Sequence, residues 1–196
     1  MKKEPLHSAR FILAETAQER LPVSEAEVAF VGRSNVGKSS LLCGITNNWK
    51  LARVSRTPGA TRGINVYEVK PGRWIVDLPG YGYAVGPARE RNYWPEMIGR
   101  YLSERPMMKR VYVLIDAEVG AGDTDLSLVH WMNQKNIPYR LVGTKIDKIG
   151  RQRHAAHRER IGAFLGSNPD EVFWVSAKEG YGLPFLPTDI ISELGL

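Results

Sequence analysis

Short runs rich in valine, isoleucine and aromatic residues alternate along the chain with longer stretches in which apolar residues recur every three or four positions. The short runs are typical of buried strands, and the longer period is typical of amphipathic helices. Their alternation predicts an α/β fold, in which a mostly parallel sheet carries helices on both faces and so forms three layers. The expected strands span residues 27–31, 64–69, 74–77, 111–116, 139–142 and 172–175. The expected helices span residues 37–47, 87–104, 123–134 and 152–165, with a last helix beyond Pro187.

A tight turn interrupts this parallel pattern. The segment Lys70-Pro71-Gly72-Arg73 separates the second and third expected strands, and proline followed by glycine favours a turn. We therefore expect an antiparallel hairpin at this point, which gives a six-stranded sheet with one antiparallel edge strand.

Two of the expected helices carry a clear apolar stripe. Pro87 suits the start of the helix over 87–104, whose inward-facing residues are expected to be Tyr93, Trp94, Met97, Ile98, Tyr101 and Leu102. Asp123 or Thr124 is the expected cap of the next helix, whose inward-facing residues are expected to be Leu126, Val129 and Met132.

Composition favours one globular domain. The chain has 196 residues, of which 43% are hydrophobic and 24% charged, so we expect a single domain over 1–196 with an N-terminal extension over about residues 1–24. A lone cysteine, Cys43, excludes a disulfide framework. We find neither a signal peptide nor an apolar run of about 20 residues, and expect a cytoplasmic monomer with no membrane contact.

A candidate phosphate-binding loop follows the first expected strand. Residues 32–39, GRSNVGKS, match the pattern G-x-x-x-x-G-K-[ST] at every fixed position. The glycines let backbone N–H groups surround a phosphate chain, and the following helix points its positive end at the same charge. Lys38 is expected to reach the β- and γ-phosphates, and the Ser39 hydroxyl to ligate Mg²⁺. The strand–loop–helix setting argues against a chance match.

A second element is expected to complete the metal site. The strand over 74–77 ends in Asp77-Leu78-Pro79-Gly80, 39 positions after Lys38 and one hairpin away from it. Asp77 is placed to orient Mg²⁺ through water, and the Gly80 N–H to meet the γ-phosphate. An aspartate before Pro-Gly is also a common turn, so this fragment gains its meaning from the loop before it.

Two further loops point to guanine as the base. Residues 144–147, Thr-Lys-Ile-Asp, resemble the [NT]-K-x-D motif, and 176–178, Ser-Ala-Lys, resemble the remaining guanine-side loop. The Asp147 carboxylate accepts from guanine N1–H and the exocyclic amine, whereas adenine would leave that charge unpaired. Each loop follows an expected strand, and the order of the motifs disfavours a P-loop ATPase or a small-molecule kinase.

Taken together, these motifs resemble those of translation-factor-type P-loop GTPases, and most closely those of the EngB (YihA) family of bacterial ribosome-biogenesis GTPases. The resemblance extends from about residue 11 to residue 191 and is most specific in 32–42, 57–61 and the continuation 77–84, DLPGYGYA. It implies a Ras-like G domain that binds GTP or GDP with Mg²⁺. It also implies a role in maturation of the large ribosomal subunit, and a need for the protein in normal cell division and septation.

The resemblance and the motifs define a set of candidate site residues. Thr61 is implied to be the switch threonine that closes on Mg²⁺ and the γ-phosphate, and residues near 80–86 are implied to form the second switch. Lys38, Thr61 and Gly80 are the expected catalytic residues, and Ser39, Thr61 and Asp77 the expected metal ligands. The full nucleotide set is Gly32, Arg33, Ser34, Asn35, Val36, Gly37, Lys38, Ser39, Ser40, Gly59, Ala60, Thr61, Arg62, Gly63, Asp77, Leu78, Pro79, Gly80, Thr144, Lys145, Ile146, Asp147, Ser176, Ala177 and Lys178.

The residue after Gly80 bears on the rate of hydrolysis. Ras-like enzymes place a water-orienting glutamine there, and this chain has Tyr81, so we expect slow intrinsic turnover that a partner or a cation stimulates. Asn35 suggests K⁺ as that cation, although it could equally hydrogen-bond within its own loop. In a glycine-rich segment, Tyr81 and Tyr83 are expected to face a partner.

Basic residues suggest a polyanion partner, because the formal net charge is +6. One group, in and before the helix over 152–165, is Lys148, Arg151, Arg153, His154, His157, Arg158 and Arg160. A second group flanks the first switch and is Lys50, Arg53, Arg56 and Arg62. A precursor of the large ribosomal subunit, through its rRNA and proteins, is the leading partner. A solvated helix face, and a protein-binding switch in division or signalling without RNA contact, remain the alternatives.

Overall fold

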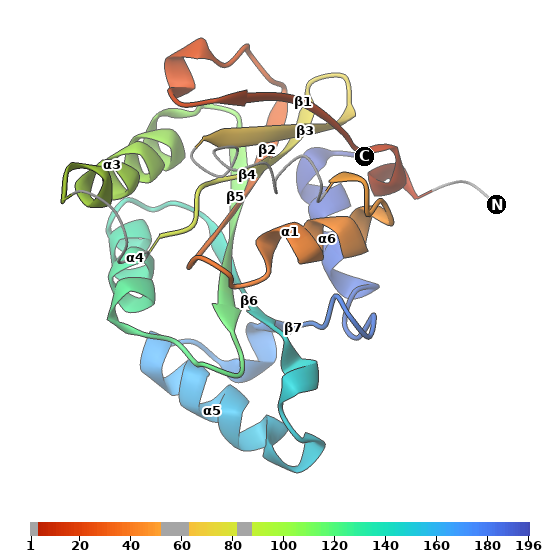
Figure 1. Ribbon diagram of the computed structural model, residues 1–196, viewed down its shortest axis with the longest axis vertical. Helices are drawn as coiled ribbons and strands as arrows, with labels where there is room; N and C mark the ends of the chain where they lie inside the picture. The colour runs from red at the N-terminus through yellow and green to blue at the C-terminus, as the bar shows by residue number, and fades with distance from the viewer. Residues whose placement is uncertain (1–3, 52–62, 82–87) are drawn as a thin grey trace.

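The computed structural model describes residues 4–51, 63–81 and 88–196, with backbone alone for 88–95. Its centre is a seven-stranded sheet in the order β1-β3-β4-β2-β5-β6-β7 (Figure 1). The strands are β1 (Arg10–Glu15), β2 (Ala26–Gly32), β3 (Ile64–Lys70), β4 (Arg73–Asp77), β5 (Met108–Asp116), β6 (Tyr139–Thr144) and β7 (Phe173–Trp174). The α-helices are α1 (Lys38–Thr46), α3 (Ala88–Glu104), α4 (Asp123–Gln134), α5 (His154–Leu165) and α6 (Phe185–Leu194).

The expected three-layer α/β class is confirmed, and the sheet has one strand more than expected. β3 and β4 form the antiparallel hairpin, and β4, β2, β5, β6 and β7 are parallel. The antiparallel strand β3 is not at the edge, because β1 from the N-terminal segment pairs antiparallel with it. β1 is half-buried along most of its length rather than alternating, so it lacks the period-two signal of a strand.

Two hydrophobic clusters hold the helices against opposite faces of the sheet, because each strand sends alternate side chains to each face. α1 and α6 cover one face together with the short 3-10 helix η1 (Pro5–Ser8), whose Leu6 is fully buried. α3, α4 and α5 lie on the other side of the sheet (Figure 1).

Several helix details differ from expectation. The cap of α4 is Gly122 rather than Asp123 or Thr124, because Asp125 in the first turn accepts the Gly122 N–H at 2.8 Å. Val129 and Met132 are buried as expected, whereas Leu126 is 38% exposed. α6 begins at Phe185 and takes Pro187 into its first turn, where a missing N–H costs nothing.

In α3 the expected inward residues Met97, Ile98, Tyr101 and Leu102 are buried. The side chains of Tyr93 and Trp94 lie outside the described residues, as does Pro87.

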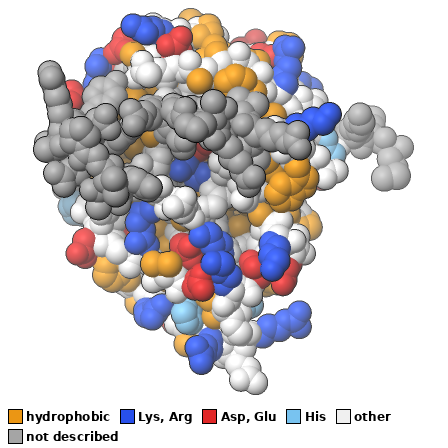
Figure 2. All heavy atoms as spheres, in the orientation of Figure 1, with side chains coloured by type: hydrophobic (Ala, Val, Ile, Leu, Met, Phe, Trp, Pro, Cys, Tyr) orange, Lys and Arg blue, Asp and Glu red, His pale blue; other side chains and the backbone are white. Residues whose placement is uncertain are grey.

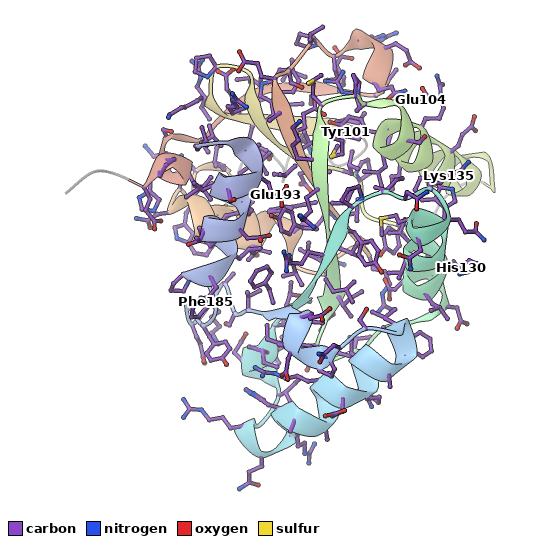
Figure 3. The ribbon with its side chains drawn as sticks, turned by 180° about the vertical axis from the view of Figure 1, so that it is seen from behind. Tyr101, Glu104, His130, Lys135, Phe185 and Glu193 are labelled. Atoms are coloured by element: carbon purple, nitrogen blue, oxygen red, sulfur yellow. The ribbon has the colours of Figure 1, made fainter. Side chains whose placement is uncertain are left out.

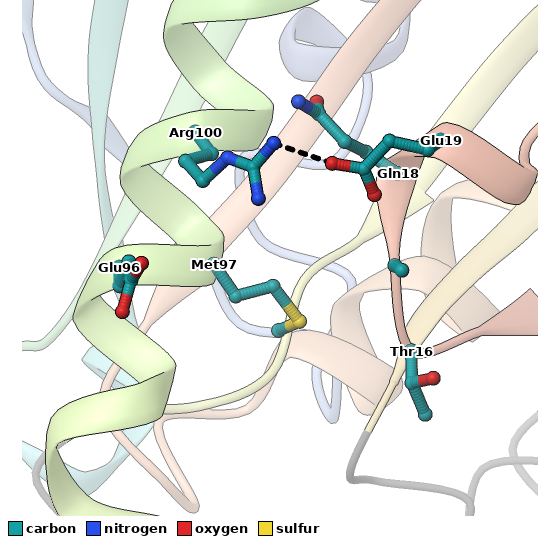
Figure 4. Close-up of a pocket in the computed structure, with 7 residues that line it drawn as sticks. Thr16, Gln18, Glu19, Glu96, Met97 and Arg100 are labelled. Carbon is teal, nitrogen blue, oxygen red and sulfur yellow. Dashed lines mark hydrogen bonds and ion pairs between the residues drawn. The ribbon is translucent and has the colours of Figure 1, made fainter.

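The last turns of α3 are tied to the N-terminal segment and to β2. Arg100 pairs with Glu19 of the 3-10 helix η2 (Gln18–Arg20) across a small pocket that Met97 also lines (Figure 4). At the end of α3, Tyr101 Oη donates to the fully buried Glu27 carboxylate at 2.7 Å, and Arg105 pairs with the same carboxylate. Figure 3 shows Tyr101 and Glu104 at this end of the helix.

Candidate nucleotide-binding site

The loop after β2 is shaped by glycines. A Cβ at Gly32 would lie 2.8 Å from the Leu114 carbonyl oxygen, so only glycine fits between β2 and β5. Gly37 has a φ of +107°, in the left-handed region that favours glycine, and it caps α1. Asn35 is also left-handed, with a φ of 62°, and its side chain is exposed. The loop therefore curls over the N-terminus of α1, with Lys38 in the first turn.

The loop after β6 holds the phosphate-binding loop in this shape through side-chain hydrogen bonds. Thr144 Oγ1 donates to the Val36 carbonyl at 2.7 Å, and Lys145 Nζ donates to the Asn35 carbonyl at 2.6 Å. Lys145 is itself left-handed, with a φ of 56°, and this turns its side chain back over the phosphate-binding loop. Lys145 and Thr144, expected to serve the base, thus also set the shape of the phosphate-binding loop.

The three sequence-distant motifs surround one cavity of about 170 Å³. Its lining comes from the start of α1, from the loop after β6 and from the loop after β7, and includes Gly37, Ser40, Leu41, Thr144, Lys145, Asp147, Val175, Ala177 and Lys178. The third loop is held by the Ser176 N–H, which donates to the Tyr181 carbonyl at 2.9 Å, and by the Glu179 N–H, which donates to Ser176 Oγ at 3.0 Å. Asp147 stays half-exposed and able to accept from a ligand.

At the phosphate end, Lys38 and Asp77 are brought together from neighbouring elements. Asp77 ends β4, is 3% exposed, and its Oδ1 is buried without a hydrogen-bond partner among the described residues. Burial raises the pKa of the Asp77 carboxyl, and the charge of Lys38 works in the opposite direction. A buried carboxylate oxygen with no partner fits a Mg²⁺ site, and the half-buried Ser39 hydroxyl stands nearby in the first turn of α1.

Gly80 closes against the same loop. A Cβ at Gly80 would lie 2.9 Å from Ser34 Cα and 3.3 Å from Lys38 Nζ, so its backbone is at the end of the Lys38 side chain. Leu78 is buried, and its N–H donates to the Phe30 carbonyl, extending the β4 pairing toward the site. The Asp77–Gly80 segment therefore lies where the γ-phosphate of a nucleotide held by Lys38 would be.

Tyr81 does not face a partner, contrary to the expectation from its glycine-rich surroundings. It is 6% exposed, and its hydroxyl donates to Asp125 Oδ1 at 2.9 Å. Arg33 Nε pairs with the other oxygen of Asp125 at 3.1 Å. Burial, followed by the charge of Asp125, raises the pKa of the Tyr81 hydroxyl, which stays protonated. The Tyr81 side chain is thus anchored to α4 rather than presented to solvent.

Two carboxylates near the site were not identified from sequence. Asp125 is fully buried and joins Arg33 of the phosphate-binding loop to Tyr81. Asp116 ends β5, and its Oδ2 accepts from Lys145 Nζ at 2.6 Å while its Oδ1 accepts two backbone N–H groups. An aspartate at the carboxyl end of a central parallel strand is a usable signal for Asp116. No such signal marks Asp125.

Some expected site residues lie outside the described residues. They are Gly59, Ala60, Thr61, Arg62, Arg53, Arg56 and Tyr83. Gly63, Pro79 and Ile146 are described: Gly63 precedes β3, Pro79 is buried beside Gly80, and Ile146 is buried in the core below the Lys145 turn.

The basic residues expected to contact RNA fall into two kinds. Lys148 is paired with Glu118 at 2.8 Å, and His157 Nδ1 lies 3.2 Å from the Ala117 carbonyl oxygen, so both are engaged within the fold. The exposed ones, in or just before α5, are Arg151, Arg153 and Arg160. Basic side chains gather over the lower part of the face in Figure 2, where Figure 1 places α5. In the part of the chain that the structure describes, no helix is both long and apolar enough to cross a bilayer.

Comparison with known proteins decides the family. A family model described as 50S ribosome-binding GTPase matches residues 27–145. A probable GTP-binding protein EngB of Thermotoga maritima is 45% identical over 93% of this chain and 93% of its own length. The chain belongs to the EngB family of P-loop GTPases. An EngB of Cereibacter sphaeroides is 36% identical over 94% of this chain and 87% of its own length.

The fold agrees with that of the EngB family. A crystal structure of a probable GTP-binding protein EngB superposes with a TM-score of 0.73, at 24% identity, over 87% of this chain and 99% of that one. The chain is thus a GTP-binding protein of the EngB type, built on the P-loop GTPase fold.

Proposed function

We propose that this protein is a slow GTPase that acts as a nucleotide-dependent switch in assembly of the large ribosomal subunit, and that normal cell division and septation depend on it. The observation that carries the nucleotide part is the single cavity to which the phosphate-binding loop, the Thr-Lys-Ile-Asp loop and the Ser-Ala-Lys loop all contribute. The ribosomal part rests on the family, whose model is described as ribosome-binding, and on the basic charge of the chain.

The proposed roles follow from where the residues lie. Lys38 would hold the β- and γ-phosphates, and Ser39, Asp77 and Thr61 would hold Mg²⁺, which supplies charge neutralisation on the phosphates when bound. The Gly80 N–H would meet the γ-phosphate. Asp147 would read guanine, with the Lys145 stem beside the base and the Ser176–Lys178 loop behind it.

The first test is competition for the site. A fluorescent GDP bound with Mg²⁺ should be displaced by GTP and GDP and not by ATP. Displacement by ATP, or no binding at all, would remove the guanine assignment and leave the phosphate-binding loop standing.

Slow turnover follows from the place of Tyr81. Its hydroxyl is bonded to Asp125, so it is not free to orient an attacking water as a glutamine does. We expect the isolated protein to hydrolyse GTP far more slowly than once per second, a typical lower bound for enzymes. Single-turnover hydrolysis with γ-labelled GTP measures this, and a rate of many per second without a partner would contradict it.

Potassium is the cation proposed to assist. Asn35 is exposed in the phosphate-binding loop, and its own carbonyl accepts from Lys145 Nζ at 2.6 Å, so its side chain would lie near the phosphates of a nucleotide bound by that loop. Hydrolysis should then be faster in K⁺ than in Na⁺ at equal ionic strength, and Asn35→Ala should remove that difference. Equal rates in the two salts would leave Asn35 as a loop residue only.

The ribosomal role is tested by sedimentation. The protein loaded with a non-hydrolysable GTP analogue should travel with large-subunit precursors, and the GDP form should not. Nucleotide-dependent binding to a division or signalling protein, with no association with particles or RNA, would instead favour the second candidate, a protein-binding switch.

A further inference from the structure

Two exposed aromatic residues lie four positions apart in the chain beyond the guanine-side loop. Tyr181 is 50% exposed and Phe185 is 70% exposed, among the largest values for apolar residues in the described part of the protein. Tyr181 lies in the turn between β7 and α6, and Phe185 begins α6 at the molecular surface (Figure 3). Neither is needed by the core, since α6 buries Leu186, Ile190 and Leu194 instead.

The turn that presents them is firmly built. Gly180 and Gly182, on either side of Tyr181, have φ values of +72° and +71°. A Cβ at Gly182 would clash with the Trp174 carbonyl oxygen, so the backbone is packed directly on the end of β7. The Phe185 N–H donates to the Gly182 carbonyl at 3.3 Å, so a tight backbone turn joins Tyr181 to Phe185.

Cationic side chains flank the aromatic pair. Arg158 of α5 donates to the Tyr181 hydroxyl at 3.2 Å, and its guanidinium lies 5.4 Å from the centre of the Trp174 ring. Among the described residues, no acidic side chain pairs with Arg158. Lys178 is exposed in the same turn, and Glu179 beside it is the neighbouring acid. We call Arg158, Lys178, Tyr181 and Phe185 the aromatic–basic surface.

We propose that the aromatic–basic surface binds unpaired bases of single-stranded RNA. Exposed aromatic rings stack on bases of any sequence, and arginine and lysine beside them hold the phosphates. Double-stranded RNA is recognised by its shape and its backbone, and would leave the exposed rings unused. The cations Arg158 and Lys178 beside the rings favour a polyanion over a protein as the partner. Arg151 and Arg153, which are exposed just before α5, extend the positive charge beyond the aromatic–basic surface and could contact further phosphates of the bound RNA.

The surface shares its backbone with the guanine site. The Tyr181 carbonyl accepts the Ser176 N–H at 2.9 Å, and Ala177 and Lys178 line the nucleotide cavity. RNA on Tyr181 and a guanine base inside the loop therefore order the same six residues, 176–181. Occupation of either side should strengthen the other by an equal factor, because coupling between two sites is reciprocal.

The test uses the full chain saturated with a non-hydrolysable GTP analogue and a fluorescently labelled single-stranded RNA of about 15 nucleotides, long enough for one such site. The double variant Tyr181→Leu, Phe185→Ala should bind this RNA at least about tenfold more weakly, since each stacked base contributes substantially. Phe164→Ala is the matched control, because Phe164 is a 40% exposed aromatic near the other end of α5. GDP affinity, measured for each variant, reports that the guanine loop is intact.

Equal RNA affinity in the double variant and the wild type would overturn the proposal, as would equally tight binding of the matching duplex. This inference rests on the proposed ribosomal function, and the two fail separately. If the wild type binds RNA through this surface but does not sediment with large-subunit precursors, the surface stands and the function fails. If it sediments, and the double variant sediments and binds RNA equally well, the function stands and the surface fails.

Discussion

At the scale of single residues, Asp147 is the residue proposed to distinguish guanine from other bases. It is half-exposed at the rim of a cavity that the phosphate-binding loop also lines, so its carboxylate can be reached by a ligand. Asp147→Asn replaces an acceptor by a group that also donates, which suits the 2-carbonyl of xanthine. We expect GTP affinity to fall by roughly 100-fold or more, with a gain for xanthosine triphosphate.

Displacement titrations with both nucleotides measure this change. Asp170→Asn is the matched control, because Asp170 is exposed on the short 3-10 helix η6 (Pro169–Glu171) at the opposite end of α5. An unchanged base preference in the Asp147 variant would show that another residue reads the base.

Tyr81 separates a structural role from a chemical one. Tyr81→Phe removes the hydroxyl that donates to Asp125 Oδ1, while Arg33 and the Gly122 N–H continue to hold that carboxylate. We expect the free energy of unfolding to fall by about 1 to 2 kcal/mol. Because the hydroxyl faces α4, GTP hydrolysis should change by less than about twofold, well below the roughly 100-fold effect of losing an acid–base group.

Urea unfolding measures the change in unfolding free energy, and single-turnover hydrolysis measures the change in rate. Tyr139→Phe, at a half-buried tyrosine on β6, controls for loss of a phenol as such. A fall in hydrolysis by two orders of magnitude, with stability unchanged, would make Tyr81 part of the chemistry.

At the scale of elements, the joint between β2 and α3 depends on one ion pair. Glu27 is fully buried and Arg105 is largely so, and the Arg105 guanidinium also lies 5.8 Å from the centre of the Trp74 ring. Among the described residues, Arg105→Ala would leave the Glu27 charge with two hydroxyl donors, Ser24 and Tyr101. We expect a loss of about 3 to 5 kcal/mol in unfolding free energy.

Denaturant titration of Arg105→Ala measures this loss, and adding Glu27→Gln should return part of it by removing the buried charge. Arg110→Ala provides the comparison, because its pair with Glu193 is partly exposed at 25% and 21% and should contribute less than about 1 kcal/mol. Similar losses from both alanine variants would mean that the Glu27 carboxylate is reached by water.

The elements that sequence predicts best are those with one strong period. β2, β5, β6 and the β3–β4 hairpin lie within a few residues of expectation, because each is an apolar run closed by a turn residue. β1 was missed because an edge strand that is half-buried carries no such run. The bounds of α4 agree with the expected 123–134, and only its cap differs: Asp125 accepts the N–H of Gly122, so the cap lies one residue before Asp123.

The candidate site also has a part that sequence predicts and a part that it does not. Sequence motifs predict the residues proposed to meet a ligand, such as Lys38, Asp77 and Asp147, because their spacing is tied to a strand end. They do not reveal contacts between loops. The bonds from Asp116 to Lys145 and from Asp125 to Arg33 and Tyr81 join segments far apart in the chain, and only the folded structure brings them together.

At the scale of the whole molecule, the basic side chains near α5 differ in how accessible they are to a partner. Arg151 and Arg153 are exposed just before α5, whereas Lys148 is paired with Glu118. If RNA follows α5, the logarithm of its affinity should fall linearly with the logarithm of salt concentration. Arg151→Glu with Arg153→Glu should flatten that slope by about 1 to 2, as expected for the loss of two phosphate contacts.

RNA binding measured from low to high KCl gives the slope. Reversing Lys109 and Lys135, two exposed lysines outside α5, is the control for net charge alone. An equal change of slope from either reversal would show that RNA senses the overall charge of the protein and not a path along this helix.

The sheet supports the two ends of the nucleotide cavity unequally. The phosphate-binding loop leaves β2, which is paired along its length with β4 on one side and β5 on the other. The guanine-side loop leaves β7, which pairs through two residues on one side only. Local opening takes less free energy where fewer bonds must break. Amide protons around 173–176 should therefore exchange with solvent sooner than those of β2. When a nucleotide dissociates, its base should leave the guanine-side loop before its phosphates leave the phosphate-binding loop.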